Sequence, residues 1–181
     1  MPSVSNSPTL IAQETPSWCF AAAEVMVRQY YGLPQMSQYE IARASTAALA
    51  EADLSLGEKW DLAQVLDSSA DVTEDVGENH KSKIVELVRG QWNAFNHDAT
   101  GGQFIAKPTW EDVRAEIDND RVFVVGSTIH YYVVSGYSDD GKGRRLWVQD
   151  PWPAGRGGQK SVLLFDEFLV AEGKVCIVFR Q

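Results

Sequence analysis

The stretch that decides the fold is Gln13-Glu14-Thr15-Pro16-Ser17-Trp18-Cys19-Phe20-Ala21-Ala22-Ala23. Thr15 is a suitable N-cap, and Pro16 suits a first helical position because its missing N–H would have no partner there. We therefore expect an apolar, buried helix from Pro16 to about Tyr31, with Cys19 just inside its start. Free N–H groups and the positive helix end stabilise a thiolate, the form of cysteine that attacks carbonyl carbons. Cys19 is thus a candidate nucleophile, although a lone cysteine is more often an inert core residue.

Two later segments contain polar residues that could act with this thiol. His130 opens the segment His130-Tyr131-Tyr132-Val133-Val134-Ser135-Gly136-Tyr137, and Asp150 opens Asp150-Pro151-Trp152-Pro153. If helix and sheet pack face to face, His130 would be the base toward Cys19 and later the acid toward a leaving amine. Asp150 would then fix the orientation of the imidazole. The backbone N–H of Cys19 and the side-chain amide of Gln13 would be two donors to an oxyanion.

Each of these residues also has a purely structural explanation. A histidine at the start of a strand is more often structural, and Asp-Pro is a common turn dipeptide. A glutamine before a helix is usually just exposed. It is the order Gln, Cys, His, Asp in these local contexts that favours a catalytic site over coincidence.

The remaining pattern predicts helices first and strands afterwards, which is the α+β class. Ser37 and Glu40 form a capping-box pattern for a second helix, which would run to Leu49 against the first. Further helices are predicted over 58–66, 81–95 and 109–118, with Asn119-Asp120 turning the chain into strands. The predicted strands form an antiparallel meander and cover residues 121–126, 131–136, 144–148, 160–165 and 175–179. We expect one domain over 1–181: a flexible leader at 1–12, a mainly helical part at 13–118 and a sheet part at 119–181.

The other polar segments have the composition of surface loops. We expect no metal site and no cofactor in this protein. The acidic residues 71–78 have the composition of a solvated loop and lack a regular spacing of oxygen ligands. Residues 96–107 have the composition of a surface loop, so His97, like His80, receives no functional role. Cys176 lies in a hydrophobic run and is interpreted as core filler. The loop 96–107, together with Trp110 and Trp152, is our candidate for the lining of a substrate groove.

Composition narrows the class of partner. The chain has 181 residues, 44% of them hydrophobic, and a formal net charge of −9. Nucleic-acid binding is not expected, because it requires clustered Lys and Arg. There is no pattern of a secretory signal or of a membrane-spanning run, so we expect a soluble protein, either cytoplasmic or delivered by a signal-less secretion route. The expected partner is a peptide or protein substrate, and the oligomeric state is left open.

These motifs resemble those of papain-like cysteine peptidases, and within them the AvrRpt2-type and C39-like proteins of bacteria. The resemblance covers most of the chain and is carried by Gln13-x5-Cys19, the Trp18–Ala22 helix start, and the segments that begin at His130 and Asp150. It implies a papain-like fold and a cysteine peptidase of the kind that serves as a bacterial effector or toxin, with Cys19 as nucleophile, His130 as base and Asp150 as orienting group. It also implies that Gln13 contributes to the oxyanion hole.

The sequence differs from these relatives at three points that bear on the expected substrate and site. The aromatic neighbour precedes Cys19, and an aspartate at 150 replaces the asparagine of plant and lysosomal papain relatives. Trp18-Cys19 differs from the Asp-Cys-Gly of leader-cleaving C39 domains, so a double-glycine leader is not the expected substrate. Only twelve residues precede Gln13, so we do not expect self-processing.

Two other functions remain open at this point. Transglutaminases and arylamine acetyltransferases use Cys, His and Asp in the same chain order, so acyl transfer to an amine is the first alternative. Gln13, six residues before Cys19, favours the hydrolase. The second alternative is an inactive papain-like module that only binds.

Overall fold

A computed structural model of the chain describes residues 2–15, 18–42, 44, 97–105, 107–126, 130–169 and 174–180. The predicted helices over 58–66 and 81–95, the acidic residues 71–78 and His80 lie outside these ranges. Within them the chain has the predicted α+β class, with helix α1 followed by a mixed set of short helices and the strands of one sheet. No helix in these ranges is long and apolar enough to cross a membrane.

The sheet has six strands in the order β1-β6-β2-β3-β4-β5, and every neighbouring pair is antiparallel. The strands are β1 Gln103–Ile105, β2 Phe123–Gly126, β3 Tyr131–Asp139, β4 Arg144–Asp150, β5 Gln159–Leu164 and β6 Val175–Val178. The predicted meander is correct for β2 to β5. It is wrong for β6, which returns to the other side of β2 and pairs Ile177 with Val124. All four residues of β2 are buried, and the strand lies inside the sheet with β3 at one edge and β6 at the other.

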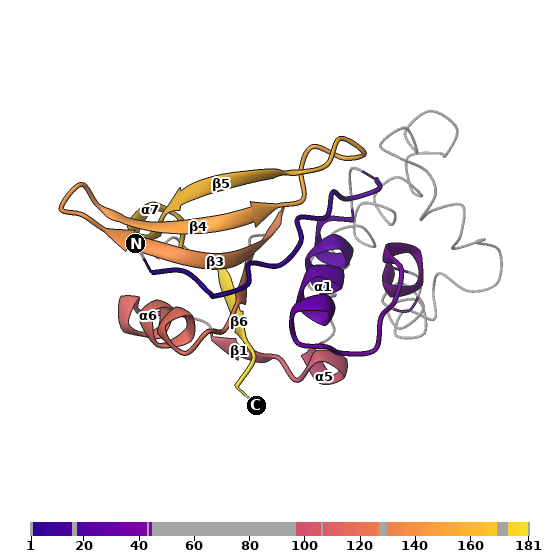
Figure 1. The fold of residues 1–181 in the computed structure, drawn as a ribbon, viewed down its shortest axis with the longest axis horizontal. Helices are drawn as coiled ribbons and strands as arrows, with labels where there is room; N and C mark the ends of the chain where they lie inside the picture. The colour runs from indigo at the N-terminus through magenta and orange to yellow at the C-terminus, as the bar shows by residue number, and fades with distance from the viewer. Residues whose placement is uncertain are drawn as a thin grey trace, which may run out of the picture.

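Helix α1 spans Cys19–Tyr30 and contacts β3. Its apolar residues are almost all buried, which agrees with the predicted buried helix. Figure 1 shows α1 beside the sheet. Its start differs from the prediction, because the N-cap is Trp18 and no side chain caps the helix. The N–H of Trp18 donates to the carbonyl of Thr15 at 3.3 Å, so the chain first makes a turn. Trp18 is buried near the ring of Tyr39. With Trp18 in this position, the helix begins at Cys19, three residues later than predicted.

The capping box predicted at Ser37 is confirmed, and the helix start predicted at Thr109 also has one. The Ser37 N–H donates to Glu40 Oε2 at 2.7 Å, and the Glu40 N–H donates to Ser37 Oγ at 3.2 Å, which starts a helix described at 38–42 and 44. Helix α6, Trp110–Asp118, begins at the N-cap Thr109 with the same reciprocal pair to Asp112. It ends at a turn in which Asp120 has a φ of 59°.

Residues 96–107 were expected to be a surface loop, and this prediction is wrong. They contain the short helix α5, His97–Thr100, and the edge strand β1. The reason is the pair Gly101-Gly102: Gly101 has a φ of +70°, and a Cβ on Gly102 would lie 2.8 Å from Ile177 Cγ2. These glycines let the backbone turn and approach β6 closely enough to pair with it.

The first residues were expected to be a flexible leader, but residues 2–4 are attached to β3. Ser3 bridges to Gly136, the Val4 N–H donates to the Ser135 carbonyl, and the Val4 side chain is buried. The β3–β4 register shifts between Val134 and Gly136, and a Cβ on Gly136 would lie 3.0 Å from the Pro2 carbonyl oxygen. Figure 1 shows this N-terminal segment running along the sheet toward α1.

Candidate active site

Cys19 is the first residue of α1, and it is buried with 1% of its surface exposed. The first N–H groups of a helix have no acceptor within it, and here helical pairing begins with the Ala22 N–H on the Trp18 carbonyl at 3.0 Å. The Cys19 N–H has no acceptor in the described part of the chain. A thiol and an N–H that no described residue accepts from therefore belong to the same residue, at the positive end of the helix.

His130 and Asp150 meet where two neighbouring strands carry them. His130 directly precedes β3, and Asp150 is the last residue of β4. The register pairs Val133 with Gln149, so the two ends are adjacent. His130 Nε2 lies 2.7 Å from Asp150 Oδ1, and the side chain of Cys19 is near enough to the ring to raise its pKa. Since Nε2 faces the carboxylate, Nδ1 is the nitrogen left for the thiol.

Three donors hold the Asp150 carboxylate. Besides His130, the Trp152 N–H donates to Oδ1 at 2.9 Å and Gln159 Nε2 donates to Oδ2 at 3.0 Å. Burial alone would raise the pKa of Asp150, but the hydrogen bonds from His130, Gln159 and Trp152 lower it below its usual value. Asp150 is therefore ionised at neutral pH and fixed in its orientation toward the imidazole.

The same contacts set the charge of His130. Burial alone would lower the pKa of His130, but the hydrogen bond with the Asp150 carboxylate and the neighbouring Cys19 side chain raise it to about 9. His130 is thus an imidazolium at neutral pH, placed between a thiol and a carboxylate. Such a ring can hold a thiolate and can later give up a proton.

This raised pKa predicts how stability depends on pH. His130 binds its proton more tightly in the folded chain than at its ordinary pKa of 6.5, so its contribution is fully present below pH 6.5 and is lost as pH rises through about 9. The loss should be on the order of 3 kcal/mol. Denaturant unfolding on both sides of this window should show it in the wild type and not in His130→Ala. An equal loss in both proteins would contradict the assignment.

Backbone hydrogen bonds hold Gln13 against residues that follow Asp150, at the end of strand β4. Its N–H donates to the Pro151 carbonyl, and its own carbonyl accepts from the Gly155 N–H, both at 2.9 Å. Its side chain is fully buried. The amide Nε2 donates to the Thr15 carbonyl at 2.7 Å, while Oε1 has no donor among the described residues. The structure thus joins His130 and Asp150 by a direct hydrogen bond, places Cys19 near the same imidazole, and gives the Gln13 amide a described partner in Thr15.

Sequence reasoning missed two glutamines that hold these groups. Gln38 is buried, and its amide bridges the segment around Gln13: Nε2 donates to the Ala12 carbonyl at 2.8 Å, and Oε1 accepts from the Glu14 N–H at 3.0 Å. Gln159 is the second, through its bond to Asp150. No local signal could have found them, because their partners lie 24 and 26 residues away for Gln38 and nine away for Gln159.

Of the two tryptophans predicted to line a substrate groove, one is buried in the core and the other is exposed near the site. Trp110 is buried against the rings of Tyr137 and Phe165, with centroids 5.3 and 5.2 Å away, so its assignment to a groove is wrong. Trp152 is 46% exposed and follows Asp150 by two residues, which keeps it at the site. Cys176 is buried on β6, and burial raises its pKa. Within the described ranges no cluster of three His, Cys, Asp or Glu side chains could hold a metal.

An N-terminal helix carrying a cysteine, followed by an antiparallel sheet that carries the histidine and the aspartate, has the architecture of the papain-like fold. The chain matches the model of the Peptidase_C39 like family over residues 7–172 and belongs to that family. This membership indicates a cysteine peptidase. No curated protein matches the chain.

Proposed function

We propose that this protein hydrolyses peptide or isopeptide bonds with Cys19 as nucleophile, His130 as acid and base, and Asp150 as the group that orients His130. The observation that carries the proposal is the His130 ring, which has Nε2 2.7 Å from Asp150 Oδ1 and lies near enough to the Cys19 side chain to interact with it. A side chain held between these two partners has the geometry that nucleophilic catalysis by cysteine requires.

In this mechanism the Cys19 thiolate attacks the carbonyl carbon of the scissile bond, and the carbonyl oxygen becomes an oxyanion. The His130 imidazolium then gives its Nδ1 proton to the leaving amine as the C–N bond breaks, and a thioester to Cys19 remains. Water attacks the thioester while the neutral His130 takes up one of its protons, and collapse of the intermediate breaks the C–S bond, releases the carboxylic acid product and restores the thiolate–imidazolium pair. Asp150 keeps Nε2 occupied throughout, so Nδ1 stays aimed at Cys19.

The oxyanion donors we propose are the Cys19 N–H and the Gln13 amide. The Cys19 N–H is not used by the helix, and Nε2 of Gln13 retains one hydrogen beyond the one given to Thr15. Two donors aimed at one oxygen would stabilise the charge that develops in the transition state.

Gln13→Ala is therefore expected to lower kcat by ~10²–10³ with little change in KM, since an oxyanion donor acts mainly in the transition state. Steady-state kinetics on one peptide would measure this. Gln35→Ala is the matched control, because Gln35 makes the same kind of amide-to-carbonyl bond, to Leu33, and is exposed. A change confined to KM would assign Gln13 to substrate binding instead.

Asp150 substitutions are expected to weaken catalysis without removing it. In a cysteine enzyme the thiolate–imidazolium pair can form before substrate arrives, so Asp150→Ala should reduce kcat by about 10- to 100-fold. Asp150→Asn should retain more activity, because its amide oxygen can still accept from His130 and from the Trp152 N–H.

Kinetics and melting temperature should be measured together on both variants. Asp140→Ala serves as control, since Asp140 accepts from Arg145 and the Lys142 N–H in an exposed turn. A lower melting temperature with unchanged kcat in Asp150→Ala would mean that Asp150 only shapes the turn before Pro151.

Within the family we propose the AvrRpt2-type branch and a role as a delivered effector, on the motifs at Gln13, Trp18–Ala22, His130 and Asp150. Profiling a peptide library with wild type and Cys19→Ala side by side tests the activity and defines the substrate. Added hydroxylamine separates hydrolysis from acyl transfer, because a transferase would form the hydroxamate in preference to the acid. Cleavage that persists in Cys19→Ala would refute the proposal.

A further inference from the structure

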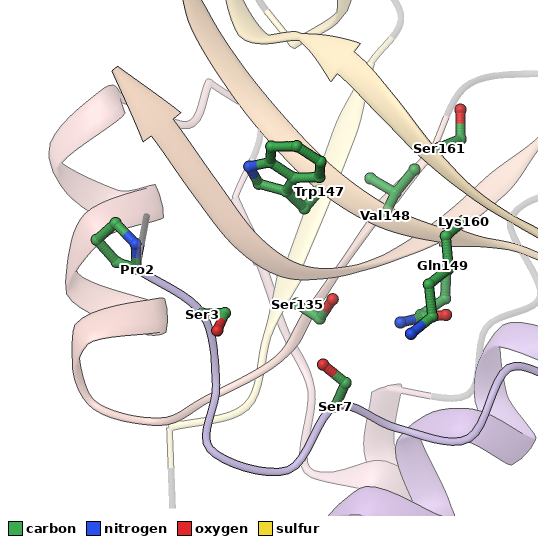
Figure 2. A pocket seen from close by; sticks show the side chains of 9 residues that line it. All are labelled: Pro2, Ser3, Ser7, Ser135, Trp147, Val148, Gln149, Lys160 and Ser161. Atoms are coloured by element: carbon green, nitrogen blue, oxygen red, sulfur yellow. The ribbon is translucent and has the colours of Figure 1, made fainter. Parts of the chain in front are cut away.

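A cavity of about 290 Å³ lies between the N-terminal segment and strands β3, β4 and β5 (Figure 2). None of Gln13, Cys19, His130 and Asp150 is among its lining residues. It lies next to the candidate active site along the chain, since Gln149 and Lys160 line it while their neighbours Asp150 and Gln159 form the pair described above. The cavity is therefore a separate site on the same two strands.

The first feature of this cavity is a buried acceptor without a donor. Gln149 is 2% exposed, and its Oε1 has no hydrogen-bond partner within the described ranges. Burying an amide oxygen without a donor destabilises the folded chain, so such an atom calls for a partner. The cavity that Gln149 lines is where a donor could reach it.

The second feature is a cation without a counterion. Lys160 is the register partner of Gln149 on the adjacent strand, and Figure 2 shows the two side chains next to each other. Lys160 forms none of the ion pairs found in the described part of the chain. It is also the one charged residue of the lining, in a chain whose net charge is −9. An anion would meet attraction here and no nearby carboxylate within the lining.

The rest of the lining adds hydroxyls and an apolar surface. Ser7, Ser135 and Ser161 contribute hydroxyl groups that can donate or accept. Trp147 contributes an indole that is 37% exposed. The volume is at the small end for ligand pockets, and a single lysine suits a monoanion better than a phosphate, which usually recruits several donors or an arginine.

We propose that this cavity binds the carboxylate end of an amino acid or peptide with an apolar side chain. The carboxylate pairs with Lys160, the nitrogen of the same residue donates to Gln149 Oε1, and the side chain lies against Trp147. The serine hydroxyls complete the hydrogen bonds of the carboxylate. This site does not depend on turnover at Cys19, so it is separable from the proposed peptidase function.

Calorimetric titration of the full-length Cys19→Ala protein with N-acetyl-leucine, leucine and N-acetyl-leucinamide tests the proposal without consuming any ligand. The acids should bind saturably, and the uncharged amide should bind at least ~10-fold more weakly, because it lacks the charge-assisted bond to Lys160. The ranking of leucine against N-acetyl-leucine tells whether a free amino acid or a peptide end is preferred. No saturable binding of either acid, or equal binding of the amide, would overturn the proposal.

Variants identify the site. Lys160→Met should lower the affinity for N-acetyl-leucine by about tenfold or more. Lys142→Met makes the same charge change in the β3–β4 turn and should leave this affinity unchanged. Gln149→Met removes an amide whose oxygen has no described partner, so affinity should fall while the melting temperature stays equal or rises. Unchanged affinity in Lys160→Met, or a lower melting temperature with unchanged affinity in Gln149→Met, would contradict the assignment.

Discussion

Replacing Cys19 with alanine is expected to lower peptide hydrolysis by on the order of 10⁵-fold or more, because the thiolate is the group that forms the bond. The protein should remain folded, since alanine is well tolerated at the start of a helix. Cys19 is buried, so the lost sulfur leaves a small void, and we expect a stability cost of about 1 kcal/mol. Kinetics and a melting curve on the same preparation measure both effects.

Cys176→Ala is the matched control for this variant. Cys176 is equally buried, at 2% exposure, but lies on β6 away from His130. Its replacement should cost a similar amount of stability and leave kcat per folded molecule unchanged. Loss of activity in both variants to the same degree would mean that packing, and not chemistry at Cys19, explains the result.

Replacing His130 with alanine is expected to have the second-largest effect, a loss in kcat on the order of 10⁴-fold. The variant removes both the partner of the thiolate and the proton donor to the leaving amine. Asp150 would keep its bonds from Gln159 and the Trp152 N–H, so the strand ends should stay in place. The melting temperature at neutral pH should fall, because the imidazolium contributes to stability there.

His97→Ala is the control for His130→Ala. His97 is in α5 and is given no role by the sequence, so its replacement should leave kcat unchanged. If His130→Ala kept near wild-type turnover, another base would have to serve Cys19 and the proposed mechanism would be wrong.

Much of the site could be predicted because its signals are local. A cysteine after Thr-Pro-Ser-Trp at the start of an apolar run, a histidine before a strand rich in valine and tyrosine, and an aspartate at the end of the next strand are each recognised from neighbouring residues. The capping box at Ser37 and the helix start at Thr109 were found for the same reason.

What could not be predicted depends on contacts between distant segments. The helix starts at Cys19 because Trp18 is buried near Tyr39, a contact that no local pattern encodes. β6 pairs with β2 across more than 50 residues, as Ile177 with Val124 shows. Residues 2–4 looked like a leader because their composition is polar, yet they satisfy backbone groups that the irregularity around Ser135 leaves open.

The central claim is that His130 activates Cys19, and competitive alkylation by iodoacetamide near neutral pH, resolved by mass spectrometry, tests it most directly. Cys19 and Cys176 are buried to 1% and 2% exposure, so burial alone predicts equal, slow labelling. If His130 activates Cys19, then Cys19 is labelled much faster than Cys176 in the wild type, and His130→Ala removes most of this difference. Equal labelling of the two thiols in the native protein, or a difference that survives in His130→Ala, would contradict it.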